Sequence, residues 1–589
     1  MPCASRAPTR ATAWSPKAGS EPVLDRLLGL ETEYAIRWSA HDPSAERPSN
    51  RLIFDAIVEA LGQRLATSSG ARKLSRRQRF IQNGGSVCYE YLPKAADGGL
   101  VEAGTPECRG PSQALLYQRA QDRMLYEALE AAEAILSREG HFGSLGLLKN
   151  CRDVEGNVYG AQENYEVELA RGAGLWLYRF GLALVVPLAV VPALVYLAAI
   201  ALVLVVFIAV LLVVFLVLVI VHLVGLVFRA DGLDPDFPEL DPVVHGIERV
   251  FEVLIKALTL PAAAAYSGLI RAFGFRRIRK HAMAFLISRP VLTGTGTLDP
   301  NSGAFGLSEK GPAIRARVRT SIAPSDRAIF DIGNLHKPLF CLMELRVRPL
   351  ASLFRRRQRL QLGLSDSNCA QQAEYLKLAT TSLVLDMAEA GALDELPRVQ
   401  RPIDALHCLI GDPELEAKVA CSDGVERSAV ELQRLYLDAA RAFVGQSAAP
   451  SLEAREIVKI WAETLDILET EPARAFGRLD WVTKRGLLAS AGAELELDAR
   501  KKIDLRYAEI GVGYFARLEA DGLAPMLVSA DEIEAAILDP PSDTPARRRS
   551  QLIREFASEG TAATVDWDRI EIKRGFLRRE VIYLDDFRR

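Results

Sequence analysis

The sequence predicts an α+β protein with an antiparallel sheet, interrupted by a pair of membrane-spanning helices. Short stretches in which apolar and polar residues alternate with period two lie between amphipathic helical stretches, which is the pattern of α+β folds. A long run, from Gly181 to Phe228, contains no charged side chain. The 589 residues are enough for roughly three or four domains of average size.

Residues 1–22 are expected to form a disordered tail. They mix Ala, Ser, Pro, Thr and basic residues. They lack the apolar core that a secretory signal peptide needs, so we do not interpret them as one.

The stretch LLGLETEYAIRW, residues 27–38, predicts the first strand. Side chains on a strand alternate between the two faces of the sheet. The sequence therefore places apolar residues on one face and two neighbouring carboxylates on the other: Leu28, Leu30, Tyr34 and Ile36 against Glu31 and Glu33.

Two further predicted strands carry a carboxylate. The stretch SVCYEYL, residues 86–92, has Glu90 opposite its apolar side chains, and residues 156–169 contain Glu163. A long amphipathic helix is expected between these strands. It should begin at Ser112, whose hydroxyl is suited to cap the first turn.

Carboxylates from several strands on one sheet face make a credible site for a divalent cation. Mg²⁺ takes oxygen ligands and often bridges to the phosphates of a substrate. The alternative is that these glutamates are ordinary side chains on the solvent face of a sheet. Because the sequence has no Walker A loop, no Rossmann glycine motif and no nucleophile elbow, the residues alone predict at most a metal–nucleotide site.

The charge-free run of 48 residues is predicted to cross a membrane twice. As one helix it would be about 72 Å long, whereas the hydrocarbon core of a bilayer is roughly 30 Å thick. Two spans within about 178–228 fit this length, although no residue marks the turn between them. Pro187 and Pro192 are expected to kink the first span.

Basic residues on both flanks predict the orientation of the spans. Arg179 lies at the start of the run and Arg229 follows it, and basic flanks favour the cytoplasmic side. An even number of spans returns the chain to that side, so we expect a multi-pass protein with soluble parts in the cytoplasm. Residues 243–280 have an amphipathic pattern, and both an interfacial position and packing on the soluble part remain open.

Charge and cysteine content exclude some classes of function. The formal net charge is -3, which gives no bulk attraction to nucleic acid, so no nucleic-acid partner is expected. The eight cysteines include no CxxC pair. A zinc ribbon and a disulfide framework are therefore not expected, and reduced thiols in a cytosolic environment fit the pattern better.

Longer motifs extend over most of residues 24–589 outside the apolar insert. The N-terminal ones are GLETEY at 29–34, NGG at 83–85, EAGTPEC at 102–108 and KN…GN.YG..ENY at 149–165. The C-terminal ones are RLQLGLSDSNCAQQAEYLKLATTSLVLDM at 359–387, LDWVTKRGLL, KIDLRYAEIGVGYFARLEADGL and ILDPPSDTPARR. Together they resemble the Pup ligase and Pup deamidase (depupylase) family, a branch of the glutamine synthetase-like carboxylate–amine ligases.

The resemblance implies a glutamine synthetase-like sheet that holds ATP and Mg²⁺, followed by a small C-terminal domain. It implies that the Mg²⁺ ligands are Glu31, Glu33, Glu102 and Glu163. It also implies that Arg289 and Asn164 contact the nucleotide and that Glu90 is the catalytic acidic residue. Ligases of this family phosphorylate the C-terminal glutamate of Pup for attack by a substrate lysine. Deamidases hydrolyse the side-chain amide or the isopeptide bond, and an acidic residue serves as base or nucleophile in either case.

Several positions depart from the family pattern. Glu90 stands where the family has an aspartate and Leu100 where it has a histidine. Gln162 and Gln361 also replace histidines, and DIGNLH at 331–336 lacks the family's arginine. Leucine can neither ligate a metal nor donate a hydrogen bond, so an active enzyme and a catalytically impaired homologue both remain open.

Three functions are compatible with these residues. The first is a membrane-tethered depupylase or Pup ligase that uses ATP and Mg²⁺ and acts on Pup or pupylated proteins. The second is a non-catalytic module that recruits Pup, pupylated proteins or proteasome components to the lipid bilayer. The third is a carboxylate–amine ligase for another small substrate.

The expected organisation divides the chain into five segments. They are the tail at 1–22, a catalytic-type domain in two parts at 23–170 and 281–500, the membrane insert at 171–280 and a small C-terminal domain at 501–589. In the family, the two segments that flank the insert both approach the active site. A hairpin at this place would therefore hold that site close to the bilayer.

Overall fold

The computed structural model describes residues 23–584 except 71–76, 92–97, 154, 229–240, 321–326, 345, 447–450, 493 and 575–578. In this part of the chain, fourteen strands form one sheet. They are β1 (Leu27–Ala40), β2 (Thr67–Gly70), β3 (Gln78–Ile81), β4 (Ser86–Tyr91), β5 (Gly99–Gly104), β6 (Cys108–Arg109), β7 (Gly143–Leu148), β8 (Gln162–Glu168), β11 (Ile314–Arg319), β12 (Arg327–Asp331), β13 (Arg357–Leu362), β16 (Ala563–Val565), β17 (Arg569–Lys573) and β18 (Arg579–Tyr583).

The strand order is β11-β12-β13-β8-β1-β5-β4-β3-β2-β16-β17-β18, and β6 and β7 also pair with β1. All pairs are antiparallel except β11 with β12 and β2 with β16. Two small ribbons lie outside this sheet: β9 (Thr297–Leu298) with β10 (Phe305–Gly306), and β14 (Lys418–Ala420) with β15 (Glu426–Ser428). The predicted α+β class with a largely antiparallel sheet is confirmed.

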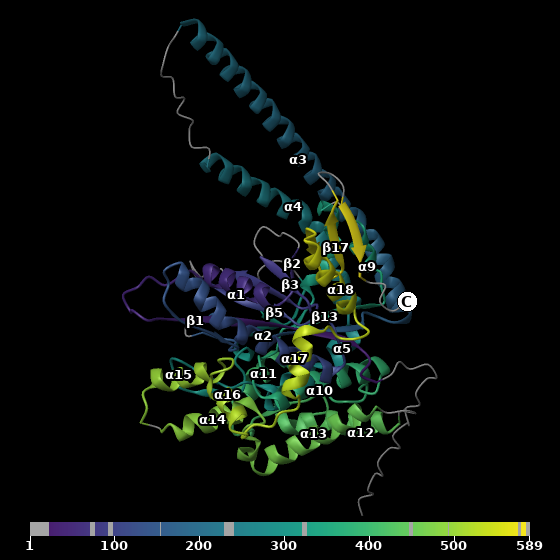
Figure 1. The fold of residues 1–589 in the computed structure, drawn as a ribbon. Helices are drawn as coiled ribbons and strands as arrows, with labels where there is room; N and C mark the ends of the chain where they lie inside the picture. The colour runs from purple at the N-terminus through teal and green to yellow at the C-terminus, as the bar shows by residue number, and fades with distance from the viewer. Residues whose placement is uncertain are drawn as a thin grey trace, which may run out of the picture.

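Most of the described helices lie around and below this sheet in Figure 1, while α3 and α4 extend above it. The described helices are α1 (Asn50–Arg64), α2 (Pro111–Arg138), α3 (Gly172–Phe228), α4 (Asp241–Phe273), α5 (Arg276–His281), α6 (Met283–Ser288), α7 (Pro290–Thr293), α8 (His336–Leu339), α9 (Arg348–Ser352), α10 (Gln371–Ala390), α11 (Pro402–Ile410), α12 (Ala429–Gly445), α13 (Leu452–Thr470), α14 (Asp480–Ser490), α15 (Leu497–Tyr507), α16 (Tyr514–Ala520), α17 (Ala530–Leu538) and α18 (Pro545–Glu559).

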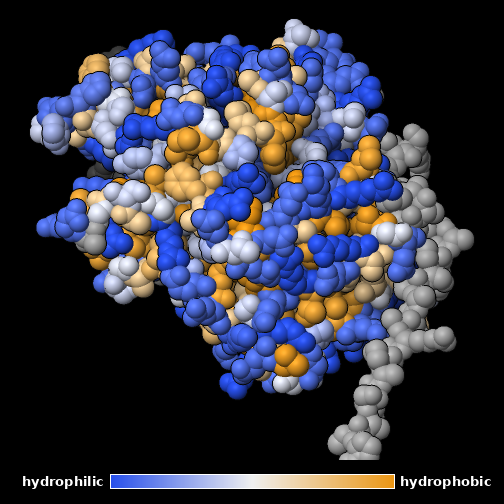
Figure 2. Space-filling view, turned by 90° about the horizontal axis from the view of Figure 1, so that it is seen from below, coloured by the Kyte–Doolittle hydropathy of each residue, from blue (hydrophilic) through white to orange (hydrophobic). Residues whose placement is uncertain are grey.

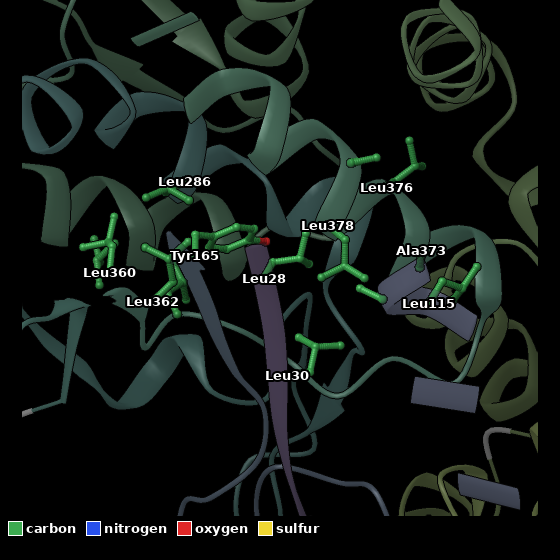
Figure 3. Packing of buried hydrophobic residues seen from close by; sticks show 14 of the residues in the cluster. Leu28, Leu30, Leu115, Tyr165, Leu286, Leu360, Leu362, Ala373, Leu376 and Leu378 are labelled. Carbon is green, nitrogen blue, oxygen red and sulfur yellow. The ribbon is translucent and has the colours of Figure 1, made fainter. Parts of the chain in front are cut away.

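Strand β1 is central to the sheet, and its period-two pattern is realised as predicted. Leu28, Leu30 and Tyr34 are buried, at 3%, 2% and 0% exposure. In Figure 3, Leu28 and Leu30 lie with Tyr165 of β8 near leucines of α10. The Tyr34 hydroxyl donates to Asp122 of α2 at 2.7 Å. The apolar face of β1 therefore packs on helices, and the other face is left for the carboxylates.

Helix α2 begins at a different residue from the one predicted. Gly110, with φ of 81°, precedes the first turn, and Pro111 opens it. Proline suits that position because it has no N–H to leave unpaired. The Ser112 hydroxyl and amide instead contact the Glu453 carboxylate of α13, so the prediction of Ser112 as the cap was wrong.

The apolar run forms one helix, and the predicted turn within 178–228 is absent. Helix α3 continues for 57 residues with both Pro187 and Pro192 inside it. Between Ala193 and Val224 the sequence contains no Gly, Pro, Asn or Asp, so no residue favours a chain reversal. The second helix of the pair is α4, as Figure 1 shows. Arg229, predicted to flank the spans, lies outside the described residues.

Helices α3 and α4 each have one end packed on the rest of the protein. On α3, a helical stripe is buried: Tyr178, Leu182, Val185, Ala189 and Ala193. On α4, Ala262, Tyr266 and Ile270 are buried, while Val253, Leu254 and Leu260 are exposed. Of the two placements considered for residues 243–280, packing on the soluble part therefore holds for the second half of α4.

The C-terminal strands extend the main sheet. Thr564 of β16 pairs with Ser69 of β2, and a separate small core joins these strands to α18 and Phe80 of β3. The predicted boundary at 501 falls inside α15, whereas the residues of this second core beyond Phe80 run from Leu552 to Leu584.

The surface farthest from α3 and α4 is mainly hydrophilic. Figure 2 shows this face from below, with small apolar patches between charged and polar side chains. On α3, by contrast, almost every side chain from Ala201 to Ile220 is exposed and apolar. Two described helical segments, Gly172–Ile220 and Val253–Phe273, are long and apolar enough to cross a membrane.

Candidate functional site

Four glutamates share one face of the sheet, which we call the carboxylate face. Glu33 of β1 lies directly opposite Glu102 of β5, and Glu102 lies opposite Cys88 of β4. Directly opposed residues, and residues two apart on a strand, share a face. Glu31 and Glu90 therefore belong to this face too. Three predicted metal ligands and the predicted catalytic residue are brought together by three neighbouring strands.

Glu33 has the most distinctive electrostatic surroundings on this face. Its Oε2 accepts a hydrogen bond from the Gly160 amide at 2.9 Å. Burial raises the pKa of Glu33, and the nearby carboxylate of Glu90 adds to the rise, whereas Lys310 and Arg327 oppose it. Burial in turn lowers the pKa of Lys310. Glu33 is thus a half-buried acid between a second acid and two cations.

Gly160 is required where it stands. Its φ is +112°, and a Cβ there would lie 2.2 Å from the Cys151 sulfur. The glycine lets the backbone turn so that its N–H reaches Glu33.

Glu31 and Asn164 form a cluster with an arginine that the sequence analysis did not name. Arg359 of β13 donates to Glu31 at 2.8 Å and to Asn164 at 2.7 Å. Asn164, a predicted nucleotide contact, lies on this face opposite Gly29 of β1. The signal for Arg359 was present in the sequence, because Arg357, Arg359 and Gln361 alternate with period two.

A cavity of about 340 Å³ lies beside this cluster. Its lining includes Glu31, Asn164, Arg355, Arg357, Arg359 and Trp567. Arginine guanidinium groups and an aromatic ring are groups that bind phosphates and a planar base, respectively. The cavity and the carboxylates thus form one continuous region of the molecule.

The C-terminal segment closes one end of this cavity. A Cβ on Gly104 would lie 3.2 Å from the Trp567 ring, so the ring sits directly over β5. The Arg549 guanidinium lies 4.7 Å from the centre of the Trp567 ring and is ion-paired with Glu107. Residues more than 400 positions apart in the chain therefore build this end of the site together.

Two predicted site residues lie on the opposite face. Glu163 of β8 pairs in register with Leu30 and is fully buried. Its two carboxylate oxygens accept hydrogen bonds from Arg289 at 2.7 and 2.9 Å. Burial would raise the pKa of Glu163, but the Arg289 guanidinium outweighs it and holds that pKa below its ordinary value.

This pair belongs to the core between the sheet and the helices. Arg289 also donates to Thr381 of α10 and to the Leu364 carbonyl. Glu163 and Arg289 therefore lie apart from the carboxylate face. That Glu163 ligates the metal and that Arg289 contacts the nucleotide stay predictions. A one-residue step along a strand moves a side chain to the other face.

The chemistry of the carboxylate face suits Mg²⁺, although the described residues contain no group of three His, Cys, Asp or Glu already placed around an ion. Mg²⁺ is commonly held by one or two carboxylates, with phosphate oxygens and water completing its shell. Glu31, Glu33 and Glu102 offer only oxygen donors. Their roles as metal ligands remain predictions.

The substituted family positions lie on the same face. Leu100 is the direct partner of Glu90 and is buried at 3% exposure. Gln162 lies opposite Glu31, and Gln361 lies opposite Asn164. His336 is turned away, because its ring contacts Ser267 of α4 at 3.2 Å and the Ala263 carbonyl at 3.2 Å.

Comparisons with known proteins find one family over nearly the whole chain. Residues 26–571 match the family described as "Pup-ligase protein". A Pup–protein ligase of Acidimicrobium ferrooxidans is 26% identical over 95% of this chain and 96% of its own length. A Pup deamidase/depupylase of Mycolicibacterium smegmatis is 33% identical, but over 49% of this chain and 56% of its own length.

Two solved structures share the fold. One is the complex between the prokaryotic ubiquitin-like protein Pup and its ligase PafA, with a TM-score of 0.63 and 20% identity, covering 96% of this chain and 89% of that chain. The other is the Pup ligase PafA in complex with ADP, with a TM-score of 0.58 and 21% identity over 87% of each chain.

Proposed function

The chain belongs to the Pup-ligase family, and from this premise we propose that it is an ATP-dependent enzyme of the Pup system, held at a membrane by α3 and α4. The observation that carries the proposal is the carboxylate face. Glu31, Glu33, Glu90 and Glu102 lie together beside a cavity lined by arginines and Trp567. Such a surface offers oxygen ligands for Mg²⁺ and cations for phosphates.

The proposed reaction is attachment of Pup to a lysine. Hydrolysis of the isopeptide bond by water, which releases Pup and the lysine amine, is the second reaction to be tested. The ligase relative aligns along nearly the full length of this chain, whereas the depupylase relative aligns along about half. In ligation, the C-terminal glutamate of Pup is phosphorylated by ATP, and the substrate amine displaces the phosphate. The products are an isopeptide bond, ADP and phosphate.

The residues of the carboxylate face take separate roles in this proposal. Glu90 accepts the proton that the attacking amine loses. Glu31, Glu33 and Glu102 hold Mg²⁺, which offsets the negative charge of the phosphates when bound. Arg359 and Asn164, which lie against the cavity, orient the nucleotide.

Membrane attachment is proposed from α3. The helix is about 85 Å long for its 57 residues, well beyond the roughly 30 Å of a bilayer core. Among the described residues, no other part of the protein covers its exposed apolar side chains from Ala201 to Ile220. We propose that α3 enters the bilayer, that α4 returns the chain, and that the carboxylate face is on the cytoplasmic side.

A two-tube assay tests the function. Detergent-purified protein with Mg²⁺ and ATP receives Pup and a lysine-bearing protein in one tube, and a pupylated protein in the other. We expect a gel shift in at least one tube. Glu90→Gln should slow the reaction by about 10²- to 10⁴-fold without changing the melting temperature. Equal rates for this variant and the unmodified protein would contradict the role of Glu90.

One observation favours an alternative without catalysis. Leu100 places an apolar side chain directly beside Glu90, where the family pattern has a polar residue. The alternative is a homologue that recruits Pup, pupylated proteins or proteasome components to the membrane. Pup binding that is independent of Mg²⁺ and ATP, with no shift in either tube, would support it. A catalytically active protein that ignores Pup would instead indicate another carboxylate–amine substrate.

A further inference from the structure

A second cavity, of about 760 Å³, opens beside the C-terminal end of α4 and carries an excess of positive charge. Its lining includes Arg271, Arg276, Arg279, Lys280, Arg317 and Arg398. None of the described residues that line it is an Asp or a Glu. It lies apart from the carboxylate face, because it shares no lining residue with the cavity there.

The cations of this basic cavity repel one another. Burial lowers the pKa of Arg279, and Arg276, Arg317 and Arg271 lower it further. The adjoining hollow contains Asp394, Glu395 and Asp423. Asp394 pairs with Arg277 at 2.5 Å and also lies 3.4 Å from His281 of the basic cavity, whereas Asp423 pairs with Arg427 at 2.6 Å. Positive charges gathered without carboxylates in the same cavity attract an anion.

The basic cavity lies at the end of the helix pair where α3 and α4 are in close contact. A Cβ on Gly181 of α3 would lie 2.4 Å from a methyl group of Leu269 of α4, and the hydroxyls of Tyr178 and Tyr266 are 3.2 Å apart. Arg271 follows Leu269 by two residues, which is about 3 Å along a helix. The cavity is thus level with the start of α3.

One side of α3 is exposed and apolar from this level onward, ahead of the fully exposed stretch from Ala201 to Ile220. Trp176 and Phe180 are 70% and 66% exposed, and the Arg179 guanidinium lies 5.7 Å from the Trp176 ring centre. Tryptophan beside arginine is typical of the headgroup region of a bilayer. Clusters of basic residues next to a membrane helix on the cytoplasmic side bind anionic lipid headgroups.

We propose that the basic cavity binds phosphate groups, and that the headgroup of an anionic phospholipid supplies them when α3 and α4 lie in a bilayer. The lipid source rests on the membrane attachment proposed above, whereas the phosphate chemistry does not. A headgroup bound here would fix the soluble part against the bilayer, at a point separate from the apolar helix.

Three ligands distinguish the sources of phosphate. Full-length protein in detergent is titrated calorimetrically with monomeric dihexanoyl phosphatidylglycerol, with dihexanoyl phosphatidylcholine and with inorganic triphosphate. The test variant combines Arg276→Gln, Arg317→Gln and Arg398→Gln, which change exposed side chains of the cavity. The control variant combines Arg455→Gln, Arg474→Gln and Arg478→Gln, exposed arginines on and after α13 with the same total charge change.

We expect phosphatidylglycerol to bind the unmodified protein and the control variant alike, and phosphatidylcholine to bind both more weakly. The test variant should lose affinity for phosphatidylglycerol on the order of a hundredfold, because each basic residue near an anionic headgroup contributes roughly a fivefold factor. Added salt should weaken binding to the unmodified protein. This second readout does not depend on how the variant folds.

The other outcomes are equally decisive. Triphosphate binding that the test variant loses, without phosphatidylglycerol binding, would retain a phosphate site and overturn the lipid source. Triphosphate bound at the carboxylate face would survive in the test variant, so the two sites are separable. If no ligand distinguishes the test variant from the control, the proposal is overturned. Flotation with uncharged vesicles tests membrane attachment independently, since it relies on α3.

Discussion

Glu33 is the residue at which the proposed function imposes a measurable cost on the fold. Burial raises the pKa of Glu33, so the folded protein keeps this proton at pH values where the unfolded chain has released it. The free energy of unfolding therefore falls, and the fold becomes less stable, as the pH rises from the ordinary glutamate pKa towards the raised one. Below the ordinary glutamate pKa, Glu33 is protonated in both the folded and the unfolded protein, so its burial does not lower the stability there.

Replacing Glu33 by glutamine should remove this pH dependence, since the amide stays neutral. Without Mg²⁺ and nucleotide, Glu33→Gln should melt at a higher temperature than the unmodified protein near pH 8, and at a similar one near pH 4. The same variant should lose Mg²⁺-dependent activity. The exposed Glu555→Gln is the matched control. A lower melting temperature for Glu33→Gln near pH 8 would contradict this account.

Glu163 and Arg289 make a contrasting prediction, because they form a buried ion pair. Glu163→Gln leaves the Arg289 charge buried without its partner, and should lower the free energy of unfolding by about 3–5 kcal/mol in denaturant titrations. Asp438→Asn, at the exposed pair with Arg441, should cost less than about 1 kcal/mol. Similar effects of the two changes would show that Glu163 is not structural.

The sequence placed some of these residues and misplaced others for a physical reason. Alternation along β1 was enough to put Glu31 and Glu33 on one face. Glu163 could not be placed in this way, because its face depends on the register between β8 and β1, where it meets Leu30. Arg359 and Trp567 come to the site through pairing and packing between distant segments, which single-strand patterns do not contain.

At the scale of elements, the contact between α3 and α4 is set by Gly181. Gly181→Leu would drive a side chain into Leu269, and should destabilise the helix pair by about 1–3 kcal/mol. Gly174→Leu, also in α3, meets no heavy atom within 4 Å at its Cβ and is the control. Thermal unfolding in detergent, with protease cleavage of α4, measures the difference. Equal behaviour of the two variants would contradict the packing.

The same helices show what length and composition predict and what they leave open. The absence of charge from Gly181 to Phe228 predicted two apolar helices, and the structure has one helix over the whole run. The turn was wrongly placed because bilayer thickness, and not a turn residue, was used to divide the run. The two helices that pair are instead α3 and the less apolar α4, whose inner residues Tyr266 and Ile270 face the protein.

At the scale of the whole molecule, the structure is one sheet whose two ends come from distant parts of the chain. The fold class and the family could be predicted, because strand alternation and long C-terminal motifs are local. The pairing of β16 with β2 joins residues 564 and 69, and no local pattern encodes it. The same long-range pairing brings Trp567 over β5 and completes the cavity beside the carboxylate face.

The measurement that tests a membrane-held Pup enzyme most directly uses protein reconstituted in vesicles with Mg²⁺, ATP and Pup. Two lysine-bearing substrates are compared that differ only in a lipid anchor, and the initial rate of Pup attachment is followed by gel shift, with Pup removal followed in parallel from the pupylated forms. The account predicts turnover that favours the anchored substrate by on the order of a hundredfold, through its higher effective concentration. Equal rates for both substrates, or folded protein with no turnover in either direction, would contradict it.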